Sequence, residues 1–184
     1  MTTSSALHRY LIGDEFKQSL VRDYRRFEIL AERGLQSSVQ RLVRRKLRGF
    51  GGTATGYRVS CETRLGSKIP DLIVWKNGKP RFFIECKDTS GFKLGSARKD
   101  WEKLKTLCPE YASVKGGYLI YVARKRDKDF ESHVFVGKHR RVTLVKIILA
   151  EHFGKDFAEW EAEYTKRAHY EIPAPKLSAK AASA

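Results

Sequence analysis

Apolar side chains recur at helical intervals in the first part of the chain. Steps of four, four, three and four residues predict an amphipathic helix, for which Asp14 is a suitable N-cap. The apolar positions are Phe16, Leu20, Tyr24, Phe27 and Ala31. Gly34 ends or bends this helix, and a second helical run extends over about residues 35–47.

Strand-like runs follow the flexible, glycine-rich stretch 49–56. They cover residues 57–62, 69–75 and 81–87. Asn77-Gly78, between the last two runs, predicts a hairpin turn. A helix is expected over 96–109, and the continuously apolar run 117–123 is then typical of a strand buried on both faces.

The rest of the pattern predicts a weaker strand and two helices before an unpatterned, disordered tail over 173–184. These three elements cover about residues 133–136, 142–152 and 156–168. Helices, three strands, a helix and a buried strand predict an α/β fold in which helices flank a mixed central sheet. We expect one domain over residues 1–172, with a C-terminal helical appendage at about 140–168.

The composition is typical of a folded, cytoplasmic protein. The chain has 184 residues, of which 41% are hydrophobic and 11% aromatic, so it is not expected to be disordered. Its longest apolar runs are far shorter than the ~20 residues that span a bilayer. Its first residues also lack the pattern of a signal peptide. We therefore expect a soluble protein without a membrane partner.

Cysteine and histidine positions do not predict a soft-metal site. The three cysteines and five histidines include neither a Cys-x-x-Cys pair nor closely spaced histidine ligands. An odd number of widely separated cysteines does not indicate a disulfide framework either. Any bound metal is expected to be a hard cation held by oxygen atoms.

Positive charge is the strongest feature of the composition. The 37 Lys and Arg residues exceed the 21 Asp and Glu residues by 16. Such an excess predicts salt-dependent binding of a polyanion, most commonly nucleic acid. Four arginines form a stripe on the second predicted helix, namely Arg41, Arg44, Arg45 and Arg48. A solubilising surface, or attachment to a ribosome or membrane surface, is the alternative interpretation.

Charged side chains interrupt two of the apolar strand runs. Asp71 begins one run, and Glu85 and Lys87 alternate with apolar residues in the next, so that both point to one face. A buried carboxylate usually has an ionic partner or a metal, because burying it alone is costly. A cross-strand ion pair, or a strand end that reaches solvent, would explain Glu85 and Lys87 by themselves. The addition of Asp71 favours a functional site.

Together these positions resemble the motif of the PD-(D/E)xK nuclease superfamily, which has the restriction-endonuclease-like fold. The matching residues are Pro70-Asp71 and Glu85-Cys86-Lys87. The resemblance spans about residues 30–123, because the order of helix, three strands, helix and strand also fits that core. It implies an endonuclease that hydrolyses DNA phosphodiester bonds with Mg²⁺, for which Mn²⁺ can substitute.

The resemblance also implies roles for individual residues. Asp71 and Glu85 would hold the divalent cation, with the carbonyl of Cys86 as a further ligand. Lys87 would orient or deprotonate the attacking water and offset charge at the phosphate. Many members add a glutamate from the first core helix, and Glu32 occupies that place here.

Other residues near the motif remain candidates. Gly34 lies close to Glu32 and interrupts the predicted helix, so Glu28 is the fallback. Glu62, at the end of the first strand, is an additional acid facing the same region. Lys93 lies in the loop after the motif and is a candidate phosphate contact. Each of these side chains is alternatively a solvated surface group.

The hairpin geometry provides a test of this site. A regular two-residue loop would pair Asp71 with Ile84 and put the Asp71 and Glu85 side chains on opposite faces. A three-residue bulged loop pairs Asp71 with Phe83, so that Glu85 lies diagonally across on the same face. We therefore predict the three-residue bulged hairpin, or an equivalent bulge within the strands.

Two other functions fit the sequence. One is a non-catalytic nucleic-acid-binding module on the same fold. The other is a basic interaction protein in which Asp71, Glu85 and Lys87 form a buried ion network. The complete set of two acids and a lysine favours the enzyme, with DNA as the foremost partner. The predicted C-terminal helices over 142–168 are a candidate homodimer interface.

Overall fold

The computed structural model describes residues 2–88, 94–126 and 140–171. The helices are α1 (Thr3–Ile12), α2 (Asp14–Arg25), α3 (Glu32–Gly49), α4 (Leu94–Glu110), α6 (Leu149–Phe153) and α7 (Phe157–Glu171). Short 3₁₀ helices cover Gly51–Ala54 and Gly154–Asp156. The strands are β1 (Tyr57–Cys61), β2 (Leu72–Lys76), β3 (Lys79–Asp88), β4 (Gly116–Ala123) and β5 (Val142–Ile148).

These strands form one mixed sheet in the order β1-β2-β3-β4-β5. β1, β2 and β3 are antiparallel neighbours, whereas β4 runs parallel to β3 and β5 runs parallel to β4. α4 forms part of the long connection that joins the parallel strands β3 and β4. The predicted α/β fold, with a mixed sheet flanked by helices, is thus confirmed.

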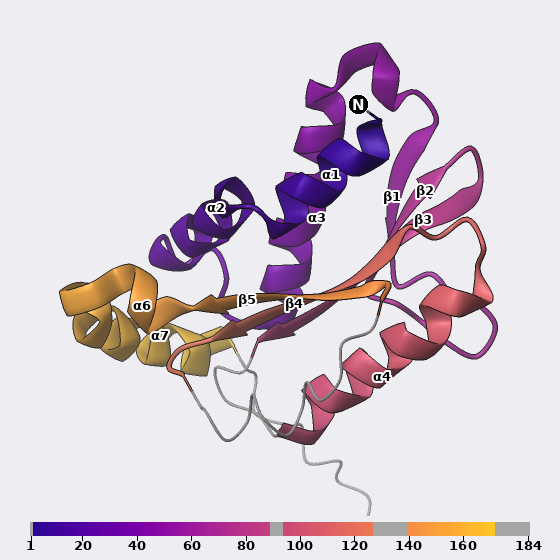
Figure 1. The fold of residues 1–184 in the computed structure, drawn as a ribbon. Coiled ribbons are helices and arrows are strands. Elements are labelled where there is room, and N and C mark those ends of the chain that lie inside the picture. Colours follow the sequence, from indigo (N-terminus) through magenta and orange to yellow (C-terminus); the bar gives the residue numbers. More distant parts are fainter. Residues whose placement is uncertain (1, 89–93, 127–139, 172–184) are drawn as a thin grey trace, which may run out of the picture.

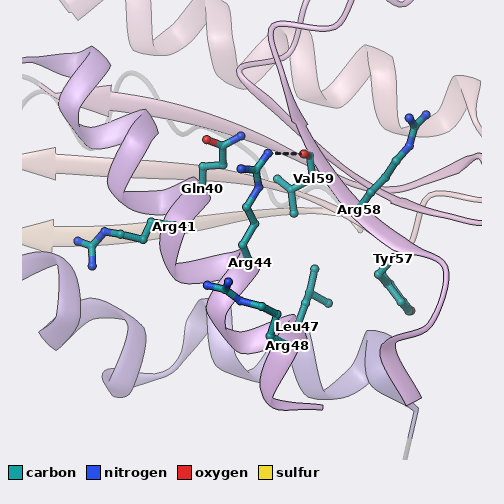
Figure 2. Close-up of a pocket in the computed structure, with 8 residues that line it drawn as sticks. All are labelled: Gln40, Arg41, Arg44, Leu47, Arg48, Tyr57, Arg58 and Val59. Atoms are coloured by element: carbon teal, nitrogen blue, oxygen red, sulfur yellow. Dashed lines mark hydrogen bonds between the residues drawn. The ribbon is translucent and has the colours of Figure 1, made fainter. Parts of the chain in front are cut away.

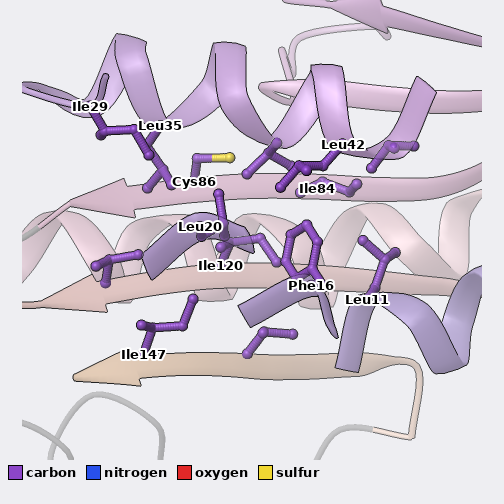
Figure 3. Packing of buried hydrophobic residues seen from close by; sticks show 14 of the residues in the cluster. Leu11, Phe16, Leu20, Ile29, Leu35, Leu42, Ile84, Cys86, Ile120 and Ile147 are labelled. Atoms are coloured by element: carbon purple, nitrogen blue, oxygen red, sulfur yellow. The ribbon is translucent and has the colours of Figure 1, made fainter. Parts of the chain in front are cut away.

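Two apolar cores cover the two faces of the sheet. The larger core packs α1, α2, α3 and α7 against residues such as Ile84 and Cys86 of β3. Figure 3 shows the part of this core between the sheet and α1, α2 and α3. The smaller core packs α4 against the other face, where Phe83 of β3 meets Trp101 and its neighbours. Figure 1 shows α4 on the opposite side of the sheet from α1 and α3. Alternate residues of β3 therefore face different helices, and the odd-numbered ones from 83 onward face α4.

A two-residue turn connects β2 to β3. Asn77 and Gly78 have positive φ angles of 50° and 76°, as a type I′ turn requires. Lys76 and Lys79 on either side of the turn pair with each other. The prediction of a three-residue loop is therefore wrong. Asn-Gly is the strongest sequence signal for the shorter turn, and it determines the conformation here.

The alternative form of that prediction, a bulge within the strands, is confirmed. Trp75 pairs with Pro80, but the next residue of β2, Val74, pairs with Phe82. Arg81 is consequently the extra residue of a bulge in β3. The bulge shifts the register of the remaining hairpin by one residue, which changes the residues that share a face.

Residues 142–148 form strand β5, so the prediction of a helix over 142–152 is wrong for most of its length. Val142 and Val145 are both buried, and their spacing of three residues resembles a helical pattern. The run is rich in β-branched residues, and pairing with β4 satisfies its backbone. Only Leu149–Phe153 is helical in this segment.

The N-terminal helices also differ from the prediction. α2 ends at Arg25, and Phe27 adopts a positive φ of 58° in the connection to α3. α3 begins at Glu32, so Gly34 lies within its first turn instead of interrupting it. Helix α1 has no counterpart in the sequence prediction, although it buries three of its side chains, Leu7, Tyr10 and Leu11.

None of the helices in the described ranges is long and apolar enough to cross a lipid bilayer. The predicted strand at 133–136 and the predicted disordered tail at 173–184 lie outside the described residues. The predicted helix at 156–168 corresponds to α7, whose Trp160 and Tyr164 pack into the larger core. The C-terminal segment is therefore one strand followed by helices, instead of helices alone.

Candidate active site

Asp71 and Glu85 lie opposite each other across the β2–β3 pair. Leu72 pairs with Ile84, and extending this register by one residue brings Asp71 against Glu85. Without the bulge in β3, Asp71 would lie opposite Ile84 and the two acids would point to different faces. The two acids are thus direct neighbours on the α4 face, instead of diagonal neighbours as the sequence analysis expected.

The two carboxylates have different surroundings. Asp71 Oδ2 accepts a hydrogen bond of 2.7 Å from the backbone N–H of Cys86. The Glu85 side chain is only 1% exposed, and its Oε2 atom lies 2.7 Å from Lys103 Nζ. This contact is an ion pair, and the other oxygen, Oε1, has no hydrogen-bond partner among the described residues. The buried Glu85 carboxylate can therefore still coordinate a cation or accept a further hydrogen bond.

Lys87 follows Glu85 by two residues and points to the same face. Its Nζ atom lies 2.6 Å from Glu32 Oε2 and 4.0 Å from Asp100 Oδ2. Glu32 is the first residue of α3, whereas Asp100 belongs to α4. Lys87 therefore connects helices from the two sides of the sheet, and the predicted Glu32 meets the predicted lysine.

Two residues of α4, which the sequence analysis missed, complete this group. Lys103 Nζ lies 3.5 Å from Asp100 Oδ1, in addition to its contact with Glu85. The available signal was an Asp-x-x-Lys pair at helical spacing beside the buried Trp101 and Leu104. We call the whole group the charged cluster, which comprises Glu32, Asp71, Glu85, Lys87, Asp100 and Lys103.

Burial raises the pKa of the acids in this cluster. For Glu85, burial and the neighbouring Asp71 raise the pKa to about 9, although Lys103 acts in the opposite direction. Burial raises the pKa of Asp71 to about 6, against the effect of the Cys86 N–H. Burial also raises the pKa of Asp100. The acids therefore favour an additional positive charge, which a proton or a cation can supply.

The pKa of Lys103 is also raised, which for a lysine favours the charged form. Burial by itself lowers the pKa of its ammonium, but Glu85 and Asp100 more than offset this effect, and the net shift is upward. Lys103 is thus held in its charged form by the acids around it. It supplies part of the positive charge that the cluster requires.

The oxygen atoms of this cluster suit a hard divalent cation. In the described part of the chain, no three Asp, Glu, His or Cys side chains form a ready-made metal site. However, Mg²⁺ commonly uses one or two carboxylates and completes its shell with waters and substrate phosphate. Asp71 and Glu85 can supply the two carboxylates. The N–H of Cys86 points to Asp71, and in a strand the carbonyl of the same residue points to the same side.

The structure separates the other acidic candidates from the cluster. The N–H of Glu62 donates to the Asp71 carbonyl at 3.0 Å, but the Glu62 side chain is exposed. Glu28 is also exposed and pairs with Arg41 at 3.4 Å and with Arg26 at 4.0 Å. Within the described ranges, neither carboxylate forms an ion pair or a hydrogen bond with the charged cluster.

The predicted arginine stripe divides between two sides of α3. Arg41, Arg44 and Arg48 line a hollow between α3 and β1 (Figure 2). Arg45 instead lines a separate, smaller depression beside Tyr10. The fifth predicted nucleic-acid contact, Lys93, lies outside the described residues.

Comparisons of the chain with protein-family models, curated proteins and solved structures give no match. The resemblance to the PD-(D/E)xK superfamily therefore stays a prediction from the sequence. The charged cluster and the arginines of α3 are the features of the chain that indicate a function.

Proposed function

We propose that the chain is a divalent-metal-dependent endonuclease that hydrolyses phosphodiester bonds of nucleic acid, with DNA as the expected substrate. One observation carries this proposal above all. Asp71 and Glu85 face each other from neighbouring strands, and Lys87 lies two residues beyond Glu85 on the same face. Two carboxylates and an ammonium in this arrangement are the groups that metal-assisted hydrolysis requires.

A restriction-endonuclease-like core is part of the proposal. The resemblance implies a helix, three strands, a helix and a further strand, and the observed order α3, β1, β2, β3, α4, β4 agrees with it. The antiparallel pairing of the first three strands and the parallel position of β4 lend further support. In this reading α3 is the first core helix, and it contributes Glu32.

Asp71, Glu85 and the Cys86 carbonyl are the groups that would hold the cation. When bound, it would activate a water molecule and neutralise charge that develops on the phosphate. Lys103 would be displaced from Glu85 in this case, because a divalent cation on the same carboxylate would repel the ammonium. Asp100, 3.5 Å from the Lys103 ammonium, keeps it close to the cluster. Lys103 is then available to pair with a substrate phosphate.

Lys87 acts beside the carboxylates. Its side chain is 12% exposed, and Glu32 and Asp100 hold its ammonium from two sides. This arrangement keeps Nζ at the cluster, where it can orient the attacking water and offset charge at the phosphate. Glu32 is a positioning residue in this scheme, because it fixes the Lys87 ammonium through a contact of 2.6 Å.

The second candidate function is a non-catalytic nucleic-acid-binding module. The ion pair between Lys103 and Glu85 favours it, because a resident ammonium already neutralises the buried acid. In that case the charged cluster would stabilise the fold, and the basic surface would bind nucleic acid without cleavage.

Plasmid cleavage in Mg²⁺, in Mn²⁺ and in EDTA tests the proposal. Wild type should cleave with either cation and should be inactive in EDTA. Asp71→Ala and Lys87→Ala should abolish cleavage while circular dichroism shows an intact fold. Lys79→Ala is a matched control, because Lys79 is an exposed lysine at the other end of the same strand.

Cleavage that survives Asp71→Ala or Lys87→Ala would transfer the chemistry to another part of the molecule. A wild type that is inert on duplex, single-stranded and junction DNA and on RNA, but binds them with strong salt dependence, would favour the binding module instead.

A further inference from the structure

A basic hollow lies between α3 and β1, on the side of α3 that faces β1. Its volume is about 510 Å³, and Figure 2 shows Arg41, Arg44 and Arg48 along α3 beside it. Tyr57 and Val59 of β1 form the opposite wall, and the residues that line the hollow include no Asp or Glu. We call this hollow, whose lining is completed by Gln40, Leu47 and Arg58, the arginine groove.

Two of the arginines that α3 contributes to the arginine groove have no acidic partner among the described residues. Arg41 pairs with the buried Asp23 at 2.7 Å. Arg44 donates to the backbone carbonyl of Val59 at 3.1 Å, and within the described residues neither Arg44 nor Arg48 forms an ion pair. Guanidinium groups on one helix face repel one another, so the groove carries a positive potential that a bound anion would relieve.

The chemistry of the arginine groove suits phosphate groups in particular. A planar guanidinium can donate two parallel hydrogen bonds to a phosphate, and it stays charged at any physiological pH. Arg44 is held in place by Val59, which reduces the conformational entropy that it would lose on binding. A row of arginines along a helix therefore matches an anion with repeated phosphates better than a single small anion.

β1 leads from the arginine groove to the backbone of Asp71, whose side chain lies on the other face of the sheet. Val59 forms part of the groove wall, and Glu62, three residues farther on, donates its N–H to the Asp71 carbonyl. At about 3.3 Å per residue, the groove begins about 10 Å from Asp71. A nucleic-acid strand advances about 3.4 Å per nucleotide along its axis, so this backbone separation alone corresponds to about three nucleotides.

We propose that the arginine groove binds backbone phosphates of the substrate strand at least three nucleotides from the bond that the charged cluster hydrolyses, with the strand passing around β1 at the edge of the sheet. This inference rests on the proposed nuclease function and adds the path of the substrate to it. Arg44 and Arg48 supply the main contacts, and Arg41 is partly neutralised by its acidic partner. Arg45 lies outside the groove on the same helix, so it contributes charge but no contact.

Fluorescence anisotropy with labelled 20-nucleotide DNA and RNA strands tests whether the arginine groove binds nucleic acid. The measurement is made in EDTA, where no cleavage occurs. The double variant Arg44→Gln/Arg48→Gln should weaken binding about tenfold and lower the slope of log affinity against log salt by about two. Arg45→Gln is the matched control and should change affinity less than about twofold. If the double variant binds more weakly than Arg45→Gln on only one of the two nucleic acids, that nucleic acid is the substrate class.

Binding of strands of increasing length tests whether one strand reaches from the arginine groove to the charged cluster. Wild-type affinity should rise when a strand becomes long enough to reach both sites, and the double variant should lose that rise. An equal loss of affinity in Arg45→Gln and in the double variant, or no loss on either DNA or RNA, would overturn the proposal.

The two proposals fail in distinguishable ways. If the groove assignment is wrong and the nuclease assignment is right, the double variant retains both wild-type binding and metal-dependent cleavage. If the nuclease assignment is wrong, cleavage is absent in wild type, whereas the difference between the double variant and Arg45→Gln persists.

Discussion

The ammonium of Lys103 lies 2.7 Å from Oε2 of Glu85, the most buried acid of the charged cluster. A carboxylate in such a position is costly to keep ionised unless a positive charge lies beside it. Lys103 supplies part of that charge in the metal-free chain. A divalent cation would be drawn to the same negative charge and would repel the ammonium, so Lys103 and the cation compete for Glu85.

Replacing Lys103 by methionine should therefore tighten metal binding. If the ion pair contributes about 1 kcal/mol, Lys103→Met should increase Mn²⁺ affinity about fivefold. The free energy of unfolding in EDTA should fall by a similar amount, because Glu85 loses its partner. Isothermal titration with Mn²⁺ and urea denaturation measure the two effects.

Lys105→Met is the matched control for this experiment. Lys105 lies on the same helix and pairs with Glu102 at 3.0 Å, away from the charged cluster. It should change neither Mn²⁺ affinity nor stability appreciably, because exposed ion pairs contribute little. If Lys103→Met leaves Mn²⁺ affinity unchanged or weakens it, the idea of competition is wrong.

The raised pKa values of the acids predict how stability depends on pH. The pKa of Glu85 rises from 4.5 to about 9 on folding, and that of Asp71 rises from 3.8 to about 6. The folded chain thus binds more protons than the unfolded chain over about pH 4 to 9. The contribution of Glu85 and Asp71 to the free energy of unfolding in EDTA should therefore decrease as the pH rises through this window.

Glu85→Gln isolates this effect, because a glutamine has no proton to lose. Urea denaturation of wild type and Glu85→Gln between pH 5 and 9 should give curves that diverge, with wild type losing stability relative to the variant at high pH. Saturating Mn²⁺ should remove the loss in wild type, since the cation replaces the proton. Parallel curves in EDTA would mean that Glu85 titrates normally.

The Lys87–Glu32 contact predicts graded effects on catalysis. Lys87→Met should lower the cleavage rate by about 10²–10⁴-fold, as expected for loss of a group that handles the attacking water. Glu32→Gln should lower it less, because Asp100 still holds the ammonium. Mn²⁺ affinity should stay close to that of wild type in both variants. Single-turnover cleavage and titration calorimetry separate the two quantities.

Glu28→Gln is the control for this pair of variants. Glu28 precedes α3 closely in the sequence, but its carboxylate pairs with Arg41 instead of Lys87. Its cleavage rate should equal that of wild type. A larger loss in Glu28→Gln than in Glu32→Gln would reverse the assignment of the helix glutamate.

The sequence located Asp71, Glu85 and Lys87, because charges within apolar strand runs are visible in the pattern itself. Their alignment was harder to predict. Arg81 forms the bulge, and its carbonyl accepts a hydrogen bond from Lys115 N–H at 2.7 Å, in the segment just before β4. The bulge in the β2–β3 pair therefore coincides with a contact to a distant part of the chain, which local turn signals do not contain.

Other differences between the prediction and the structure also arise from contacts between distant parts of the chain. Strand β5 shares its apolar spacing with a helix, and only pairing with β4 decides between the two. Lys103 has the sequence context of an ordinary surface lysine, and its role depends on the packing of α4 against the sheet. Glu32 reaches Lys87 because α3 begins at that residue, and the helix boundary is not encoded by periodicity alone.

Anomalous diffraction from crystals soaked in Mn²⁺ is the most direct test of the charged cluster. The account predicts a peak between the carboxylates of Asp71 and Glu85, with the ammonium of Lys103 moved away from Oε2. An ordered cluster with no peak there, and with Lys103 still in contact with Glu85 at millimolar Mn²⁺, would contradict it.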